Sequence, residues 1–414
     1  HASAKLAVMA TQEHLERLAH GLHDSTDGDR PVPSQVQMCI DIYALALPRL
    51  TLRRKSISET IQPLLSEISA LLGLISNDCN RSDGREILCH ISQLARAALK
   101  WCTDAGTHPK EIGTVKNILK TCLDSTLVSL AHCICAALSS RTFKTCFPRL
   151  GSVTSPEEGW QEGEGAMNEL LETYSLLDIT TEKFADRTSI AGMIMLAHAP
   201  SERLSLSTLI PLLLPFLQTA CSQNFAVDEA LALTMKTLTR ASTSPGCTLT
   251  EEHLFSLVTQ LATLSSAHQN ANVRFQAYRT LALLLNMAPS PIRFQIVREL
   301  IADTTLPPMQ VAAVALLKEA LAATNPPDIF WSPAFMQTFG PLLFRPISLS
   351  AAANSIVDFT SSYEGKYVIE VLNLYYVLLL RDASNKTGLR DKDNMKNVDR
   401  VMLAPLRAQM TRWI

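Results

Sequence analysis

Side chains that bind metal ions gather near the start of the chain. Glu16, His20 and His23 are spaced by four and three residues, so on a helix they would lie on one face. Carboxylate and imidazole groups are ordinary zinc ligands. The same three residues also suit the solvated face of a terminal helix, and we interpret them as a surface cluster rather than a metal site.

A second group of potential zinc ligands is His132, Cys133 and Cys135. Residues two positions apart on a helix point about 200° away from each other, so one helix cannot direct both thiols at one ion. None of the ten cysteines belongs to a CxxC pair. We therefore expect buried, reduced thiols, which are typical of proteins of the cytosol or nucleus.

Motifs for catalysis and calcium binding are missing from the sequence. No GxSxG, Walker A, GxGxxG or HExxH pattern occurs. Asp391 to Asn394 begins like a calcium loop, but its sixth and twelfth positions are Lys396 and Met402 instead of Gly and Glu. Because nothing assembles a nucleophile, a base and an oxyanion donor, we predict no enzyme activity, no metal and no cofactor.

The composition favours a large helical protein. The chain has 414 residues, of which 47% are hydrophobic and only 15 are Gly, while Leu and Ala are abundant. A net charge of −2 provides no general basic surface for nucleic acid. The most apolar run, Leu209 to Leu217, is too short to span a membrane. We expect neither nucleic acid nor a membrane as a partner.

Helical patterns recur along the whole chain. Leu254, Leu257 and Leu261 repeat at helical spacing. Ser56 opens a segment with Glu three positions later, which fits a capping box, and Pro291 suits a first helical turn. These signals predict about seventeen helices, most of them roughly 12–20 residues long, and no convincing strand.

A weak repeat indicates the architecture. Val273, Ala277 and Leu281 recur every four residues, and Val311 and Ala315 show the same spacing 38 residues later. Offsets near 40 residues with paired helices are typical of HEAT repeats. We therefore predict an all-α fold, a HEAT/armadillo-like helical-repeat solenoid in two halves; the alternative is a non-repetitive helical bundle.

An acidic stretch with several glycines marks the predicted domain boundary. Residues 155–165 hold three Gly, four Glu and one Pro, a composition typical of solvated linkers. We predict an N-terminal helical region over residues 1–152, an acidic linker over residues 153–165, and a C-terminal HEAT-like repeat region over residues 166–414.

A distinctive turn follows an apolar helix near the end of the chain. Asn385 and Gly388 tolerate left-handed backbone angles, and the Thr387 hydroxyl can bond to nearby backbone. These three residues predict a structural turn. Asn385 also begins a glycosylation sequon, an interpretation that reduced thiols weaken, and the loop could instead form a partner-binding corner.

Basic residues accumulate from this turn onward. The segment from Arg381 carries eight basic and four acidic residues in a chain that is slightly acidic overall. Basic and aromatic side chains at one end of a solenoid suit an acidic protein partner, although a solvated helix face explains them as well. The predicted partner-binding residues are Arg381, Lys386, Arg390, Lys392, Lys396, Arg400, Arg407 and Trp413.

The same segment resembles the C-terminal signature of the glomulin, ALF4 and Yap-binding protein family. The resemblance consists of an apolar helix from Asn373 to Asp382, the Asn385-Lys-Thr-Gly-Leu389 turn, Asn397, and a Leu403-Ala-Pro-Leu406 step. It covers about 35 residues and includes no active site. It therefore implies a HEAT-like adaptor or inhibitor rather than an enzyme.

The resemblance implies two alternative partners. Glomulin-like members cover the RING subunit of a cullin–RING ubiquitin ligase, where the ubiquitin-conjugating enzyme docks. Yap-binding members assist a stress transcription factor in peroxide signalling, and a related member is linked to kinetochores. From the first alternative we expect a steric regulator of ubiquitin ligation, monomeric when free, in the cytoplasm and also in the nucleus.

Overall fold

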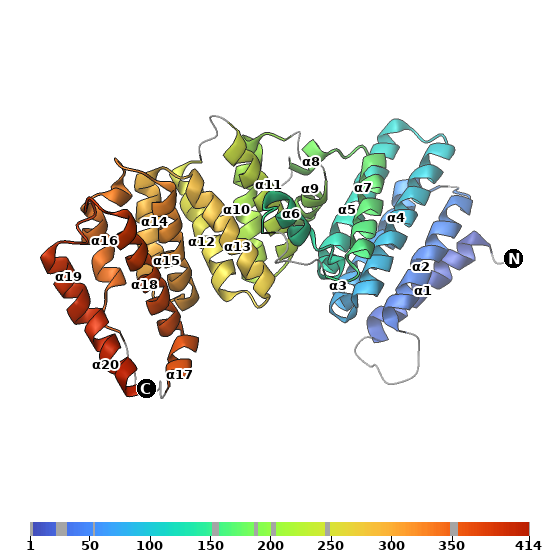
Figure 1. Ribbon diagram of the computed structural model, residues 1–414. Coiled ribbons are helices and arrows are strands. Elements are labelled where there is room, and N and C mark those ends of the chain that lie inside the picture. The colour runs from blue at the N-terminus through green and yellow to red at the C-terminus, as the bar shows by residue number, and fades with distance from the viewer. Residues whose placement is uncertain are drawn as a thin grey trace. The chain divides into compact units, whose positions relative to one another are not determined.

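The computed structural model describes residues 3–21, 31–52, 54–150, 157–185, 189–199, 204–244, 249–347 and 355–413. The chain divides into two compact units, residues 1–237 and residues 238–414. Within the described residues the structure is helical and contains no strand (Figure 1). The predicted all-α, helical-repeat fold is confirmed.

The first unit is a stack of helices in which most of the packed helices are one to three places apart along the chain. α4 lies against α2, α5 and α7, and α3 lies against α5. The bounds are α1 (Ala4–Gly21), α2 (Val32–Ala46), η1 (Leu47–Arg49), α3 (Ile57–Ile75), η2 (Ser76–Asp78), α4 (Arg81–Asp104), α5 (Pro109–Ile134), α6 (Leu138–Cys146), α7 (Trp160–Leu176), α8 (Thr181–Ala185), α9 (Ile190–His198), α10 (Leu206–Gln223) and α11 (Val227–Thr243), whose last residues belong to the second unit.

The second unit is built from helix pairs. α12 packs on α13, α14 on α15, and α18 on α15 and α17, as Figure 1 shows. The bounds are α12 (Glu251–Ala267), α13 (Ala271–Met287), α14 (Ser290–Ala302), α15 (Pro307–Ala323), η4 (Ile329–Trp331), α16 (Ala334–Leu343), α17 (Ile356–Ser361), α18 (Tyr363–Arg381), α19 (Lys392–Val398), the π-helical turn η5 (Asp399–Leu403) and α20 (Ala404–Trp413).

Local sequence signals explain where several helices begin. The Ser56 side chain accepts a hydrogen bond from the Glu59 backbone, and the Glu59 carboxylate accepts one from the Ser56 backbone, so the predicted capping box is present. Pro291 lies in the first turn of α14 as expected. Small side chains then allow close packing, since Ala277 of α13 and Ala313 of α15 are fully buried.

The predicted linker is wrong for residues 160–165, which form the start of α7. A Cβ atom at Gly163 would lie 2.0 Å from the carbonyl oxygen of Ile134, so this glycine permits close helix packing rather than flexibility. The Arg141 guanidinium lies 4.2 Å from the centre of the Trp160 ring and pairs with Glu164. Residues 153–156 lie outside the described residues.

The position of α7 also explains why the compact units do not divide near residue 153. α7 packs against α4 and α5, which places it inside the first unit, and the division falls between residues 237 and 238 instead.

Among the described helices, none alone is long and apolar enough to cross a membrane. α5 and α6 together, bent by 71°, pass that test of length and composition.

Candidate functional site

The residues considered for metal binding do not form a site in the described part of the chain. No group of three or more His, Cys, Asp or Glu side chains there could hold an ion. Glu16 and His20 lie on α1, while His23 falls outside the described residues. The Cys133 thiol lies 3.6 Å from the Cys79 carbonyl oxygen and is buried, whereas Cys135 follows the end of α5 with a φ of 43°.

Burial suppresses ionisation of the thiols. It raises the pKa of Cys39 and of Cys79 to about 11 and that of Cys133 to about 12. A thiol must lose its proton to act as a nucleophile, so these groups are poorly reactive near neutral pH. Burial also raises the pKa of Cys89, Cys102, Cys122, Cys135 and Cys221. Cys247 lies outside the described residues.

The turn after α18 is organised by one buried carboxylate, that of Asp382. Its Oδ1 accepts the Lys386 backbone N–H at 2.8 Å, and its Oδ2 accepts the Thr387 backbone N–H at 2.9 Å and the Thr387 hydroxyl at 2.6 Å. Asn385 and Gly388 have φ angles of 53° and 77°. The chain therefore reverses through two left-handed residues while Asp382 satisfies three donors.

The Asn385 side chain adds a second set of bonds to this turn. Its Nδ2 donates to Asp391 Oδ1 at 2.8 Å, and its Oδ1 accepts the Arg390 backbone N–H at 2.7 Å. Leu389 is fully buried beneath the turn. Both ends of the amide are occupied within the chain, so the turn is a rigid platform that carries Lys386 and Arg390.

The predicted basic residues have different surroundings. Arg381 Nη1 donates to the Leu321 carbonyl oxygen at 3.4 Å, and Arg390 donates to the Leu379 carbonyl oxygen. Arg407 alone among the predicted cations forms an ion pair with a described acidic side chain, its Nη2 lying 3.0 Å from Asp399.

The remaining predicted cations are exposed on the turn, on α19 and on η5. Arg400 Nη2 donates to the Asn397 side chain at 3.0 Å, and neither it nor the three lysines has an ion-pair partner among the described residues. These exposed cations are Lys386, Lys392, Lys396 and Arg400. Their positive charge is available to an acidic partner.

Trp413 lies apart from this basic group. Its ring centre is 5.3 Å from that of Phe359 in α17, and it is partly buried against Val368 and Leu406. Figure 1 accordingly shows the end of α20 beside α17. The sequence pattern placed Trp413 on the same exposed rim as the arginines. The structure packs the indole partly against an apolar cluster within the chain, and its part in partner binding stays a prediction.

A row of five exposed residues on α18, three of them apolar, was not identified from the sequence. Lys366, Ile369, Asn373, Tyr376 and Leu380 are spaced by three, four, three and four residues, so they follow one face of the helix. Ile369, Tyr376 and Leu380 are 41%, 62% and 63% exposed. We call these five residues the α18 row.

The opposite face of α18 provides the helix with its core contacts. Val368, Val371, Leu374 and Leu378 are buried there. A surface helix needs only one apolar stripe for its packing, so the exposed apolar residues of the α18 row are not required by the core. The sequence shows an apolar helix here, but it does not separate a buried face from an exposed one.

A family model described as "Uncharacterised protein family, YAP/Alf4/glomulin" matches residues 136–412. The match covers more than half of the chain and includes α18, the turn and α19. The chain matches no curated protein.

Proposed function

The chain belongs to the YAP/Alf4/glomulin family, and from this premise we propose that it is a non-enzymatic adaptor or inhibitor that acts by binding a protein partner. A family of helical-repeat proteins suits this task because stacked helices hold a wide surface in a fixed shape.

The α18 row is the observation that carries the proposal. Tyr376 and Leu380 leave more than 60% of their surface in water, and burying such side chains against a partner contributes a favourable free energy of about 25 cal/mol per Å². The turn beside the row carries Lys386 and Arg390, whose charges would orient an acidic partner. Aromatic and arginine side chains at one place are typical of binding hot spots.

The partner that we propose is the RING subunit of a cullin–RING ubiquitin ligase. The C-terminal helices would cover the RING surface on which a ubiquitin-conjugating enzyme docks, and the effect would be steric, requiring no catalytic group. Such a regulator would act in the cytoplasm and also in the nucleus. Support comes from family membership and from the exposed surface on the last helices.

The Yap-binding alternative, an adaptor in peroxide signalling, requires a thiol that oxidants reach readily. Eight thiols have a pKa raised by burial, which lowers their thiolate fraction. These eight thiols are therefore poor redox sensors, and the Yap-binding alternative would depend on Cys146, which is partly exposed, or on Cys247, which lies outside the described residues.

A pull-down with two matched variants tests the proposal. Leu380→Asp places a charge in the α18 row, and Leu74→Asp places one at a leucine of equal exposure, 61%, on α3. With a purified RING–cullin complex, we expect the wild type and Leu74→Asp to bind alike and Leu380→Asp to bind about 30-fold more weakly. Equal capture of all three would exclude the α18 row as the binding surface.

A further inference from the structure

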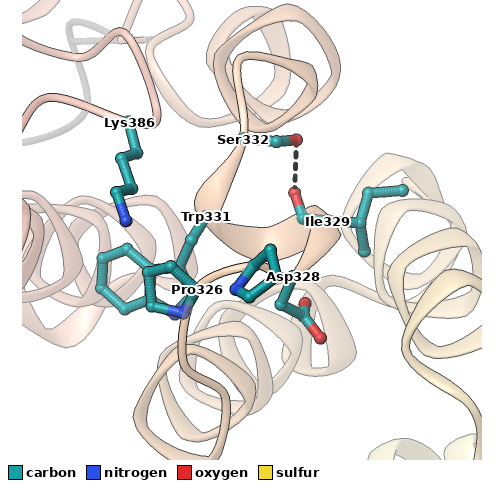
Figure 2. A pocket seen from close by; sticks show the side chains of 7 residues that line it. Pro326, Asp328, Ile329, Trp331, Ser332 and Lys386 are labelled. Atoms are coloured by element: carbon teal, nitrogen blue, oxygen red, sulfur yellow. Dashed lines mark hydrogen bonds between the residues drawn. The ribbon is translucent and has the colours of Figure 1, made fainter.

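A pocket of 610 Å³ opens at the end of α18, within the second unit. Six of its lining residues come from the connection between α15 and α16, and the seventh comes from the turn after α18 (Figure 2). They are Pro326, Pro327, Asp328, Ile329, Trp331, Ser332 and Lys386. Neither the α18 row nor the family assignment uses this pocket.

The apolar wall of the pocket is fixed in position before any ligand binds. Trp331 Nε1 donates to the Thr324 carbonyl oxygen at 3.0 Å, and the Arg381 guanidinium lies 5.6 Å from the centre of the indole. Asp328 Oδ1 accepts the Phe330 backbone N–H at 3.0 Å, and the Ser332 hydroxyl donates to the Ile329 carbonyl oxygen at 2.8 Å. A wall held in this way loses little conformational entropy on binding.

Opposite charges lie at the two ends of the pocket. Lys386 is exposed, has no ion-pair partner among the described residues, and has its backbone fixed by Asp382. Figure 2 shows its amine directed toward the Trp331 ring, with Asp328 on the far side of Pro326. One end of the pocket is therefore cationic, the other end is anionic, and an aromatic and proline surface lies between them.

We propose that this pocket binds an extended acidic segment of a protein partner. A large apolar side chain of that segment would lie on Pro326, Pro327 and the accessible edge of Trp331, which is 7% exposed. A neighbouring carboxylate would pair with Lys386. Asp328 fixes the direction in which the segment binds, because its carboxylate would repel an acidic residue of the segment at the anionic end of the pocket. An inorganic anion would use the lysine but leave the apolar wall exposed, so the wall favours a peptide. The proposal holds whether or not the partner is a RING protein.

A labelled peptide provides the test. The probe is fluorescein-Ser-Leu-Phe-Glu-Asp-Ser-amide, and its matched control carries Gln and Asn in place of Glu and Asp. With the full chain, fluorescence polarisation should give a dissociation constant below about 1 mM for the acidic probe and binding about tenfold weaker for the control peptide.

Three variants locate the site. Lys386→Gln should weaken binding of the acidic probe about threefold, whereas Lys100→Gln, which removes the same charge from an exposed position on α4, should leave it unchanged. Asp328→Asn keeps the oxygen that caps η4 and removes the repulsion, so it should strengthen binding about twofold. Misfolding would weaken binding in either variant. Weaker binding by Lys386→Gln together with stronger binding by Asp328→Asn therefore cannot arise from misfolding.

The proposal is overturned by any of three results: no binding of the acidic probe, equal effects of Lys386→Gln and Lys100→Gln, or weaker binding by Asp328→Asn. A competition experiment adds a further criterion. If inorganic phosphate displaced the probe at the same concentration as the unlabelled peptide, the proposal would be overturned, because the site would then be a simple anion site. Failure here would leave the RING pull-down unaffected, since Leu380 does not line the pocket.

Discussion

Arg85 of the first unit and Lys386 of the turn after α18, in the second unit, use their charges in opposite ways. In the first unit, Arg85 donates to the carbonyl oxygens of Cys133, Ile134 and Cys135 at 3.1–3.3 Å, and to that of Gly159 at 3.0 Å. It thereby satisfies the last carbonyls of α5 and joins them to the start of α7. By contrast, the Lys386 side chain on the turn after α18 is exposed and has no ion-pair partner among the described residues. The contrast shows that a basic residue indicates binding only where the fold does not already use its charge.

Apolar side chains repeat the contrast. α4 buries Ile87, Leu88, Ile91 and Leu94 and carries no exposed large hydrophobic residue. α18 buries one stripe and exposes another. The fold needs the first stripe alone, which is why we propose the α18 row as the binding surface.

Replacement of Arg85 should have the largest effect. Arg85→Ala removes donors from four backbone carbonyls at a side chain that is only 11% exposed, so we expect a loss of about 3 kcal/mol in the free energy of unfolding. Lys386→Ala should change it by less than about 0.5 kcal/mol. Chemical denaturation followed by circular dichroism measures the free energy of unfolding of both variants. Similar losses in the two variants would contradict the difference between Arg85 and Lys386.

Two glycines of α7 sharpen the comparison inside the first unit. Gly163→Ala forces a Cβ against the Ile134 carbonyl oxygen, and we expect about 2–3 kcal/mol of destabilisation. Gly165 has no neighbouring atom within 4 Å of an added Cβ, so Gly165→Ala should stabilise the helix by about 0.5–1 kcal/mol. If both substitutions stabilised the protein equally, α7 would not pack closely on α5.

The turn after α18 is predicted to be rigid even though its Lys386 has no ion-pair partner among the described residues. Asp382→Ala leaves three donors without their acceptor, and we expect about 2 kcal/mol of destabilisation together with faster amide exchange at Lys386 and Thr387. Asp399→Ala, which breaks only the exposed pair with Arg407, should cost under about 0.5 kcal/mol. Hydrogen exchange detected by mass spectrometry distinguishes a fixed turn from a loose one.

The smallest effect is expected from thiol chemistry at neutral pH. The pKa of Cys133 is raised from 9.0 to about 12 in the folded state, so its protonated form stabilises the fold below pH 9, and this contribution is lost as pH rises from 9 toward 12. The native chain should label slowly at pH 8, and stability should fall only in alkali. Rapid modification of Cys39, Cys79 or Cys133 at pH 7 would contradict this assignment and revive the redox alternative.

Part of this structure could be predicted from the sequence because the determining interactions are local. The capping box at Ser56 depends on residues three positions apart, and helical periodicity does not depend on the neighbouring helix. The bends at Asn385 and Gly388 likewise follow from residue type.

The errors arose where long-range packing decides the outcome. Glycine and glutamate near residue 160 suggested a linker, but Gly163 meets a carbonyl 29 residues earlier in the chain. The α18 row could not be separated from core residues, since exposure depends on which helices are neighbours. The pocket joins two connections about 55 residues apart, and no local pattern brings them together.

The central claim is that the α18 row and the turn after α18 act by occupying a surface on the partner. Competition tests this claim most directly. The RING–cullin complex is saturated with a labelled ubiquitin-conjugating enzyme and titrated with the wild-type chain, Leu380→Asp or Leu74→Asp. We predict that the wild type and Leu74→Asp displace the enzyme completely, and that Leu380→Asp requires about 30-fold more protein. A ternary complex that holds the enzyme and the wild-type chain together would contradict the account.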